Sequence, residues 1–207
     1  VGTDNFNERN YIVSLNARKD NLFGKWNGSA SLFGQVMKQS SNWLNSSAGT
    51  LTVPNLFTLS NSVGNPGVSE GIRERQINSI FGTAELNYNN FWFINVTGRN
   101  DWSSTLSEKN RSYFYPSIST SLVISDMITS SGGTTPTWLN FAKLRASYAE
   151  TGGSLNPYEL YNTYSIGKDP NGNTTASRNS TLYNSDVLSE LLKSFEVGFD
   201  IKAFNRV

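Results

Sequence analysis

The sequence predicts an all-β protein, an antiparallel up-and-down sheet that is a segment of a transmembrane β-barrel. Three observations support this. About seven stretches alternate apolar and polar residues over roughly 9 to 14 positions, which is long for a globular strand but suits a tilted membrane crossing. Their connections are short at one end and long at the other, as in outer-membrane barrels, whose long loops lie outside the cell. Aromatic residues gather near both strand ends.

Composition narrows the class of protein. Only 37% of the 207 residues are hydrophobic and 16% are charged, where a soluble domain usually has about 25% charged residues. With 17 basic and 16 acidic residues and no run of like charge, we expect no nucleic-acid partner. Without Cys or His, the chain has no disulfide, imidazole base or common zinc ligand. No apolar run approaches the roughly 20 residues of a membrane-spanning helix, so any crossing must use strands.

The first two strands are expected at residues 10–19 and 25–38, joined by a short turn at 20–24. Residues 1–9 are polar and read as the end of a loop, so the chain is expected to start within a longer protein. Residues 39–75 are rich in Ser, Asn, Gly and Thr. So long a connection is unusual in a compact domain and usually marks a functional loop, here predicted to be extracellular.

The next three strands include the pair that flanks a polar connection. Strands are expected at 76–88 and 91–99, with the two-residue turn Asn89-Asn90 between them, a composition that tight hairpins prefer. A second extracellular loop is expected at 100–112, followed by a strand at 113–124.

The last third contains two more strands. Residues 125–140 are expected to form a linker with a short helical turn, and 141–150 a sixth strand. A third long extracellular loop is expected at 151–192, then a seventh strand at 193–204 and a turn at Asn205-Arg206. Around the second loop, the residues predicted to face lipid are Trp92, Ile94, Val96, Gly98, Phe114, Pro116, Ile118, Leu122 and Ile124.

Aromatic residues are predicted to form two girdles at the membrane surfaces. Aromatic residues are also common in any strand, and the polar face fits a solvated sheet as well as a water-filled lumen. Strand length and loop asymmetry must therefore decide between a soluble sheet and a membrane barrel. The short-turn girdle comprises Phe23, Trp26, Tyr88, Phe91, Trp92, Phe141 and Phe204, and the long-loop girdle Tyr11, Tyr113, Phe114, Tyr115, Tyr148 and Phe195.

Three motifs follow one another along the chain: GRNDWSSTL with NRSYFYPS at 98–106 and 110–117, KLRASYAETGG at 143–153, and SFEVGFD at 194–200. In this order they resemble the barrel of SusC-like (SusC/RagA) TonB-dependent outer-membrane transporters of Bacteroidota. The resemblance covers most of 76–204. One departure is VLSELLK at 187–193, where the family usually has a segment like Leu-Lys-Pro-Glu.

The resemblance implies a function. The intact protein would be a plugged barrel of about 22 strands that imports oligosaccharides or peptides with a SusD-like surface lipoprotein and energy delivered by TonB. Seven strands leave two open edges and cannot close a barrel, so residues 1–207 would be only part of the barrel domain. That domain would be embedded in outer-membrane lipid. The plug and the TonB-contacting segment would lie outside this chain.

The connection at 100–112 and the adjoining strand ends hold the best candidate binding residues. They combine hydrogen-bonding groups with aromatic faces, which can grip a sugar or peptide. Alternatively, Asp101 and Arg111 pair to hold the loop, and the aromatic residues belong to the outer girdle. The candidate ligand-binding residues are Arg99, Asn100, Asp101, Trp102, Arg111, Tyr113 and Tyr115.

No catalytic constellation, metal site or cofactor motif is evident, so the chain is not expected to be an enzyme. Residues 169–173 mimic the start of a calcium loop, but Thr174 and Ser180 replace its required Gly and Glu, which favours a turn. Carboxylates such as Glu85 and Glu150 are expected to line the lumen or to pair with nearby cations.

Two other functions stay open at this point. One is a passive porin or a barrel that anchors an adhesin, which an upstream plug and TonB box would exclude. The other is a soluble secreted β-sandwich that binds carbohydrate, which would be extracted without detergent.

Overall fold

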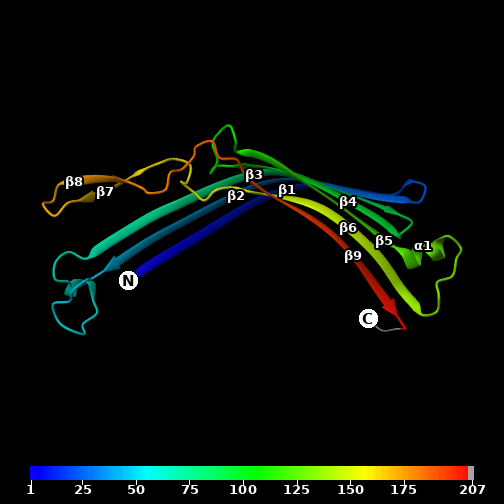
Figure 1. The fold of residues 1–207 in the computed structure, drawn as a ribbon, viewed down its shortest axis with the longest axis horizontal. Coiled ribbons are helices and arrows are strands. Elements are labelled where there is room, and N and C mark those ends of the chain that lie inside the picture. Colours follow the sequence, from blue (N-terminus) through cyan, green and yellow to red (C-terminus); the bar gives the residue numbers. More distant parts are fainter. Residues whose placement is uncertain (205–207) are drawn as a thin grey trace.

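The computed structural model describes residues 1–204. Its main body is one curved antiparallel sheet of seven strands in the order β1-β2-β3-β4-β5-β6-β9 (Figure 1). A separate hairpin, β7–β8, lies beyond the sheet. The expected turn at Asn205-Arg206 falls outside the described residues. The strands are β1 (Gly2–Phe23), β2 (Trp26–Ser47), β3 (Gly67–Tyr88), β4 (Trp92–Ser103), β5 (Ser112–Val123), β6 (Leu139–Gly153), β7 (Tyr164–Lys168), β8 (Thr174–Arg178) and β9 (Glu190–Ala203).

The topology is up-and-down, as predicted. Each strand of the sheet pairs with its neighbour along the chain, except that β9 follows β6 after the β7–β8 hairpin. The connections β1–β2, β3–β4 and β5–β6 lie at one end of the sheet, which we call the short-turn end (Figure 1). The other connections lie toward the opposite, long-loop end.

Three strands are longer than predicted. β1, β2 and β3 each have 22 residues, so the expected loop at 39–75 is reduced to 48–66, and residues 2–9 are strand rather than loop. The cause is that ladder hydrogen bonds continue where apolar alternation stops. Val1 and Gly2 already lie against Asn45 and Ser46, although their side chains carry no pattern that indicates a strand.

The other two expected loops also have different bounds. β4 runs to Ser103 and β5 begins at Ser112, so the connection spans 104–111. The long segment expected at 151–192 begins after Gly153, ends before Glu190 and contains the β7–β8 hairpin. β-branched residues favour strands even where no apolar face is buried, so these polar segments can pair as a hairpin. Because they lack apolar alternation, the sequence pattern did not reveal the β7–β8 hairpin.

The predicted turn and helical segment are present. Asn89 and Asn90 have φ of 47° and 59°, and the Phe91 N–H donates to the Tyr88 carbonyl at 3.1 Å, which is the geometry of a type I′ turn. A short helix, α1 (Ile124–Ser130), lies in the β5–β6 connection. Ile124 is therefore helical and does not continue the lipid-facing row of β5. Within residues 1–204, no helix has both the length and the apolar character to span a membrane.

The two faces of the sheet differ sharply in charge. We call the face with Val13, Leu32, Val96 and Phe199 the outward face, and its apolar side chains are largely exposed, Val13 at 77% and Phe199 at 73%. Its central positions carry no Asp, Glu, Lys or Arg. The charge-free outward positions run through 11–17, 26–36, 78–88, 92–102, 114–122, 142–148 and 195–201.

The opposite, inward face is polar and charged along the same stretches. Glu85, Arg99, Arg145, Glu196 and Asp200 all lie on it. Exposed apolar side chains on one face and charges only on the other are typical of a barrel wall between lipid and a wet lumen.

The charge-free band is staggered along the strands. At the long-loop end it stops at the Tyr11–Val36 pair on β1 and β2, and at the Tyr148–Phe195 pair on β6 and β9. Through the ladder, Tyr148 aligns with Ala17, whereas Asn78 of β3 and Trp102 of β4 lie level with Tyr11. The offset of the band therefore arises between β4 and β6.

Four members of the predicted short-turn girdle, Trp26, Tyr88, Phe91 and Trp92, form a contiguous cluster. Ring centroids lie 5.0 Å apart for Trp26–Tyr88, 5.7 Å for Trp26–Trp92 and 5.3 Å for Tyr88–Phe91. Such rings suit a membrane surface, where one end is apolar and the other wet.

The predicted long-loop girdle needs a correction. Phe114 and Tyr148 share the outward face, but Tyr113 and Tyr115 alternate to the inward face. These two tyrosines therefore do not belong to an outer girdle.

Candidate functional site

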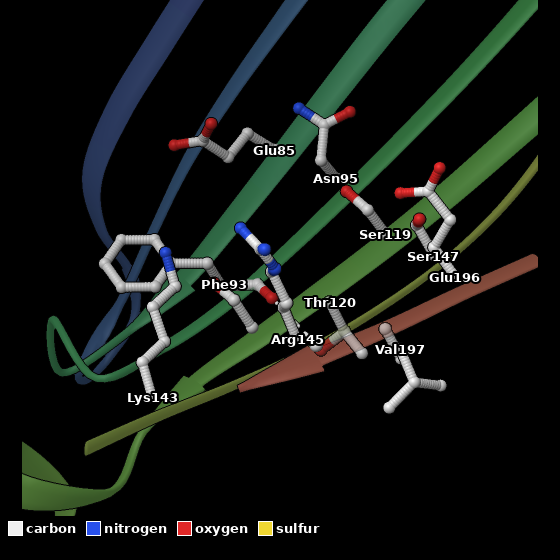
Figure 2. Close-up of a pocket in the computed structure, with 13 residues that line it drawn as sticks. Glu85, Phe93, Asn95, Ser119, Thr120, Lys143, Arg145, Ser147, Glu196 and Val197 are labelled. Carbon is white, nitrogen blue, oxygen red and sulfur yellow. Dashed lines mark hydrogen bonds between the residues drawn. The ribbon is translucent and has the colours of Figure 1, made fainter. Parts of the chain in front are cut away.

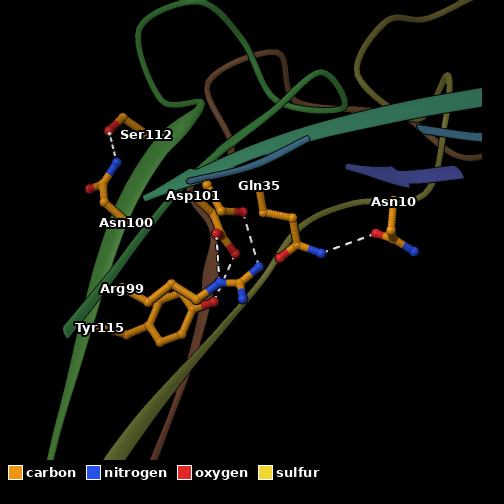
Figure 3. Close-up of polar contacts among 8 residues, drawn as sticks. Asn10, Gln35, Arg99, Asn100, Asp101, Ser112 and Tyr115 are labelled. Carbon is orange, nitrogen blue, oxygen red and sulfur yellow. Dashed lines mark hydrogen bonds and ion pairs between the residues drawn. The ribbon is translucent and has the colours of Figure 1, made fainter. Parts of the chain in front are cut away.

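The inward wall near the long-loop end holds a fixed network around Asp101. This carboxylate is only 4% exposed. The Arg99 Nε–H donates to Asp101 Oδ1 at 2.8 Å, and the Tyr115 hydroxyl donates to Asp101 Oδ2 at 2.7 Å (Figure 3). Both carboxylate oxygens are thus occupied, and charge-assisted bonds of this kind are the stronger ones. Because β4 places residues i and i+2 on one face, Arg99 reaches Asp101 within its own strand.

Arg99 is also held from the neighbouring strand β3. Its Nη2 donates to Ser79 Oγ at 3.0 Å, and its guanidinium lies 5.0 Å from the centre of the Phe81 ring. Phe81 in turn stacks on Phe33 of β2 at 4.6 Å. Phe33 breaks the alternation of β2 because it forms this inward aromatic stack. Three strands therefore hold one guanidinium on the inward wall.

Two tyrosines extend the network toward β6. The Tyr113 and Tyr115 rings stack with centroids 6.1 Å apart. A Cβ added at Gly152 would lie 2.6 Å from the Tyr113 ring, so Tyr113 packs directly on the β6 backbone. The result is an aromatic surface beside a paired Arg and Asp, a combination that can stack on a sugar ring or bond a peptide.

The other predicted residues lie elsewhere. Asn100 and Trp102 alternate to the outward face, where Asn100 Nδ2 donates to Ser112 Oγ at 3.0 Å (Figure 3). Arg111 is in the connection and lies 3.7 Å from Glu108. The alternative pairing of Asp101 with Arg111 is therefore wrong, because Arg99 already occupies the carboxylate.

A second inward feature is a hollow of 490 Å³ nearer the short-turn end, lined by Glu85, Lys143, Arg145 and Glu196 among others. Figure 2 shows Glu85, Asn95, Arg145 and Glu196 on one side of the sheet, with Val197 pointing to the other. A Cβ at Gly198 would lie 2.5 Å from Arg145 Nε, so this side chain lies across β9. Arg145 also lies 3.9 Å from Asp200. The hollow offers charges of both signs and several hydroxyls.

The calcium-like segment is a turn, as expected. Asp169 Oδ1 accepts the backbone N–H groups of Asn171 and Asn173 at 2.9 and 2.8 Å, and Oδ2 accepts Asn173 Nδ2 at 2.9 Å. These bonds, the Asn173 side chain first, hold the pKa of Asp169 below its usual value. Across residues 1–204, no cluster of three or more potential ligands could hold a metal ion.

Sequence reasoning missed Ser79, Phe81 and Phe33, which support Arg99. The pairing of Phe33 with Phe81 requires the β2–β3 register, which no local pattern specifies. Only the break in alternation at Phe33 indicated that something inward was needed there.

Comparisons with known proteins agree with this geometry. No protein-family model matches the chain. TonB-dependent receptor P3 of Formosa agariphila is 28% identical over 144 residues, which cover 66% of this chain and 14% of that protein. The RagAB peptide transporter structure superposes with a TM-score of 0.82 at 18% identity, over 99% of this chain and 22% of the transporter chain. The chain matches a SusC/RagA-like barrel segment.

Two further structures show the same SusC/RagA-like fold. The RagAB peptide importer superposes with a TM-score of 0.82 in its "closed-closed" state and 0.77 in its "open-open" state, each at 19% identity over 99% of this chain. The chain spans about a fifth or less of the length of these proteins. The seven-strand sheet therefore corresponds to one part of a barrel wall.

Proposed function

We propose that this chain is part of the wall of an outer-membrane active importer. The intact protein would take up oligosaccharides or peptides as the transporter subunit of a SusCD-like complex. A SusD-like lipoprotein would deliver substrate, and TonB would act through a segment outside this chain. The single observation that carries the proposal is the charge-free outward band opposite a charged inward face, on a sheet that superposes on RagAB at a TM-score of 0.82.

The connections at the long-loop end are then proposed to be extracellular. The short-turn end, with its Trp26–Tyr88–Trp92 cluster, would lie at the periplasmic surface. This orientation follows the rule that outer-membrane barrels have short periplasmic turns and longer outer loops.

Within this wall, the inward members of the candidate set are proposed to contact passing substrate. Arg99, Tyr113 and Tyr115 line the lumen near its outer mouth, with Asp101 holding the first and last in place. A contact between substrate and Asn100, Trp102 or Arg111 receives no support from their positions. For the inward three, substrate contact stays a prediction.

Uptake by cells that express the intact protein tests the proposal. Cells with a functional TonB should accumulate a labelled oligosaccharide or peptide mixture, and the same cells without TonB should not. Equal uptake in both strains would favour a passive porin instead. A protein recovered without detergent would support the secreted β-sandwich and contradict the membrane placement.

A further inference from the structure

Two cations stand side by side on the outward face. Arg9 of β1 and Lys38 of β2 are direct cross-strand partners, and both side chains are exposed. Like charges directly opposite each other destabilise a sheet. Among residues 1–204, neither one forms an ion pair. The repulsion between the two cations therefore destabilises this part of the sheet, and an anionic ligand would remove that repulsion.

Arg9 and Lys38 lie next to the long-loop end of the charge-free band. The next outward pair toward the short-turn end is Tyr11–Val36, the last pair of the charge-free band. Arg9 and Lys38 thus lie one step beyond the apolar band, at the depth where lipid headgroups begin, and Tyr11 marks the interface itself.

The two cations line a hollow rather than a flat surface. It measures 750 Å³ and includes the outward residues Asn7, Ser40 and Gln76, with Tyr158 from the long connection after β6. Gln39 and Arg75, which alternate to the inward face, also line it. Amides and hydroxyls of this kind bond the polar parts of a headgroup. Glu74 is the carboxylate that lines the hollow, diagonal to Lys38, and Arg75 lines it as a third cation, so three positive charges are opposed by one negative charge.

Below the cations, the apolar surface is recessed. Gly34 lies between Val13 and Ile80 in the second pair of the band. A Cβ added there would meet no atom within 4 Å, while Val13 and Ile80 are exposed on either side at 77% and 55%. This recess gives an acyl chain a seat directly under a polar hollow.

We propose that Arg9 and Lys38 bind the phosphorylated headgroup of an outer-leaflet lipid, with one acyl chain over Gly34. The inference rests on the proposed membrane placement and adds a fixed lipid to the wall. Basic side chains at a membrane surface attract anionic headgroups, and the recess explains why a lipid is favoured over a free anion.

Native mass spectrometry on the full-length protein in phosphatidylcholine nanodiscs tests this. The probe is bisphosphorylated lipid A, compared with the same lipid after removal of both phosphates. The R9Q/K38Q variant should bind the bisphosphorylated lipid roughly 10- to 30-fold more weakly than the wild type. The matched control is Lys19→Gln, an outward Lys near the other end of β1, which should change binding less than about twofold.

A second variant separates the acyl seat from the charges. Gly34→Leu fills the recess, so it should weaken binding of both lipid forms by a similar factor and leave the preference for phosphate unchanged. Equal binding by wild type and R9Q/K38Q would overturn the proposal. So would an equal loss in Lys19→Gln, or displacement of the lipid by millimolar inorganic phosphate, which would indicate a free-anion site.

The outcome is separable from the proposed function. If R9Q/K38Q loses the lipid but wild-type cells show no TonB-dependent uptake, the import proposal fails and the lipid site stands. If uptake is TonB-dependent and R9Q/K38Q binds lipid A normally, the lipid site fails alone. Wild-type protein that does not enter nanodiscs would contradict both.

Discussion

At the scale of single residues, the Asp101 carboxylate is the hydrogen-bond acceptor of two neighbouring side chains. It is 4% exposed and holds both Arg99 and Tyr115. Asp101→Ala should lower the free energy of unfolding by about 1–3 kcal/mol, because a partly buried guanidinium and a hydroxyl lose their acceptor. Thermal unfolding of the detergent-solubilised protein, followed by the gel shift of folded against heated barrel, measures this.

The matched control for Asp101→Ala is Asp20→Ala. Asp20 pairs with Arg18 at 3.3 Å, but both side chains are largely exposed, at 62% and 77%. Exposed pairs of this kind contribute about 0–1 kcal/mol, so Asp20→Ala should unfold close to the wild-type temperature. A similar loss in both variants would mean that burial of the Asp101 network contributes nothing.

Asn90 tests the β3–β4 turn. Its φ of 59° lies in the left-handed region, where a β-branched side chain is strained by about 1–2 kcal/mol. Asn90→Val should therefore destabilise the barrel by that amount, whereas Asn90→Gly should match or exceed the wild-type stability. Both are read from the same unfolding assay, and indifference to Val would contradict the type I′ assignment.

At the scale of elements, alternation predicted the strands along the charge-free band and failed beyond it. Between Tyr11 and Ala17 the outward side is apolar, so period 2 is visible. From Arg9 to Gly2 both faces of β1 are mostly polar, and backbone pairing with β2 continues the strand. That pairing is non-local and leaves no trace in either segment alone.

The candidate site shows the same division. Arg99, Asp101, Tyr113 and Tyr115, which the sequence groups by chemistry, lie together in the structure, and their contact with substrate stays a prediction. Alternation could have separated Asn100 and Trp102, since Trp92 to Gly98 already fixed the outward parity of β4. The support from Ser79 and Phe81 required the β3–β4 register, which follows from the Asn89-Asn90 turn only once its type is known.

The β7–β8 hairpin depends on Asp169 in its turn. Because hydrogen bonds from Asn173 and Asn171 depress the pKa of Asp169 in the folded state, its contribution to the turn is present above the unfolded value of 3.8. It is lost as pH falls through the lower folded value. Asp169→Ala should accordingly loosen the hairpin at pH 4.5 and make little difference near pH 2.

Pepsin cleavage around Tyr164 and Ile166 measures this opening, since both are exposed strand residues that pepsin accepts. The ratio of variant to wild-type cleavage rates, taken at each pH, cancels the pH dependence of the protease. We expect a ratio above one at pH 4.5 that falls toward one at pH 2. A constant ratio would mean that the Asp169 charge does not hold the turn.

At the scale of the whole molecule, the distribution of charge is what supports the proposed placement of the sheet in a membrane. A soluble sandwich would cover one face with a second layer, yet the outward face keeps Val13 and Phe199 largely exposed while every charge in the same span faces inward. At the roughly 35–45° strand tilt of outer-membrane barrels, the ten residue steps from Trp92 to Trp102 would rise about 23–27 Å, close to the roughly 25 Å apolar band of such barrels.

Cysteine labelling of the intact protein tests this placement, because the 207 residues contain no Cys and each introduced thiol is unique in this part of the protein. On intact cells, a membrane-impermeant maleimide should label Ser60→Cys in the β2–β3 connection. It should label Ser131→Cys, at the end of α1, only after the outer membrane is permeabilised. In nanodiscs, Ser119→Cys on the inward face should react and Val96→Cys on the outward face should not, because lipid covers it. Labelling of Val96→Cys at the rate of Ser119→Cys would place the outward face in water and contradict the barrel wall.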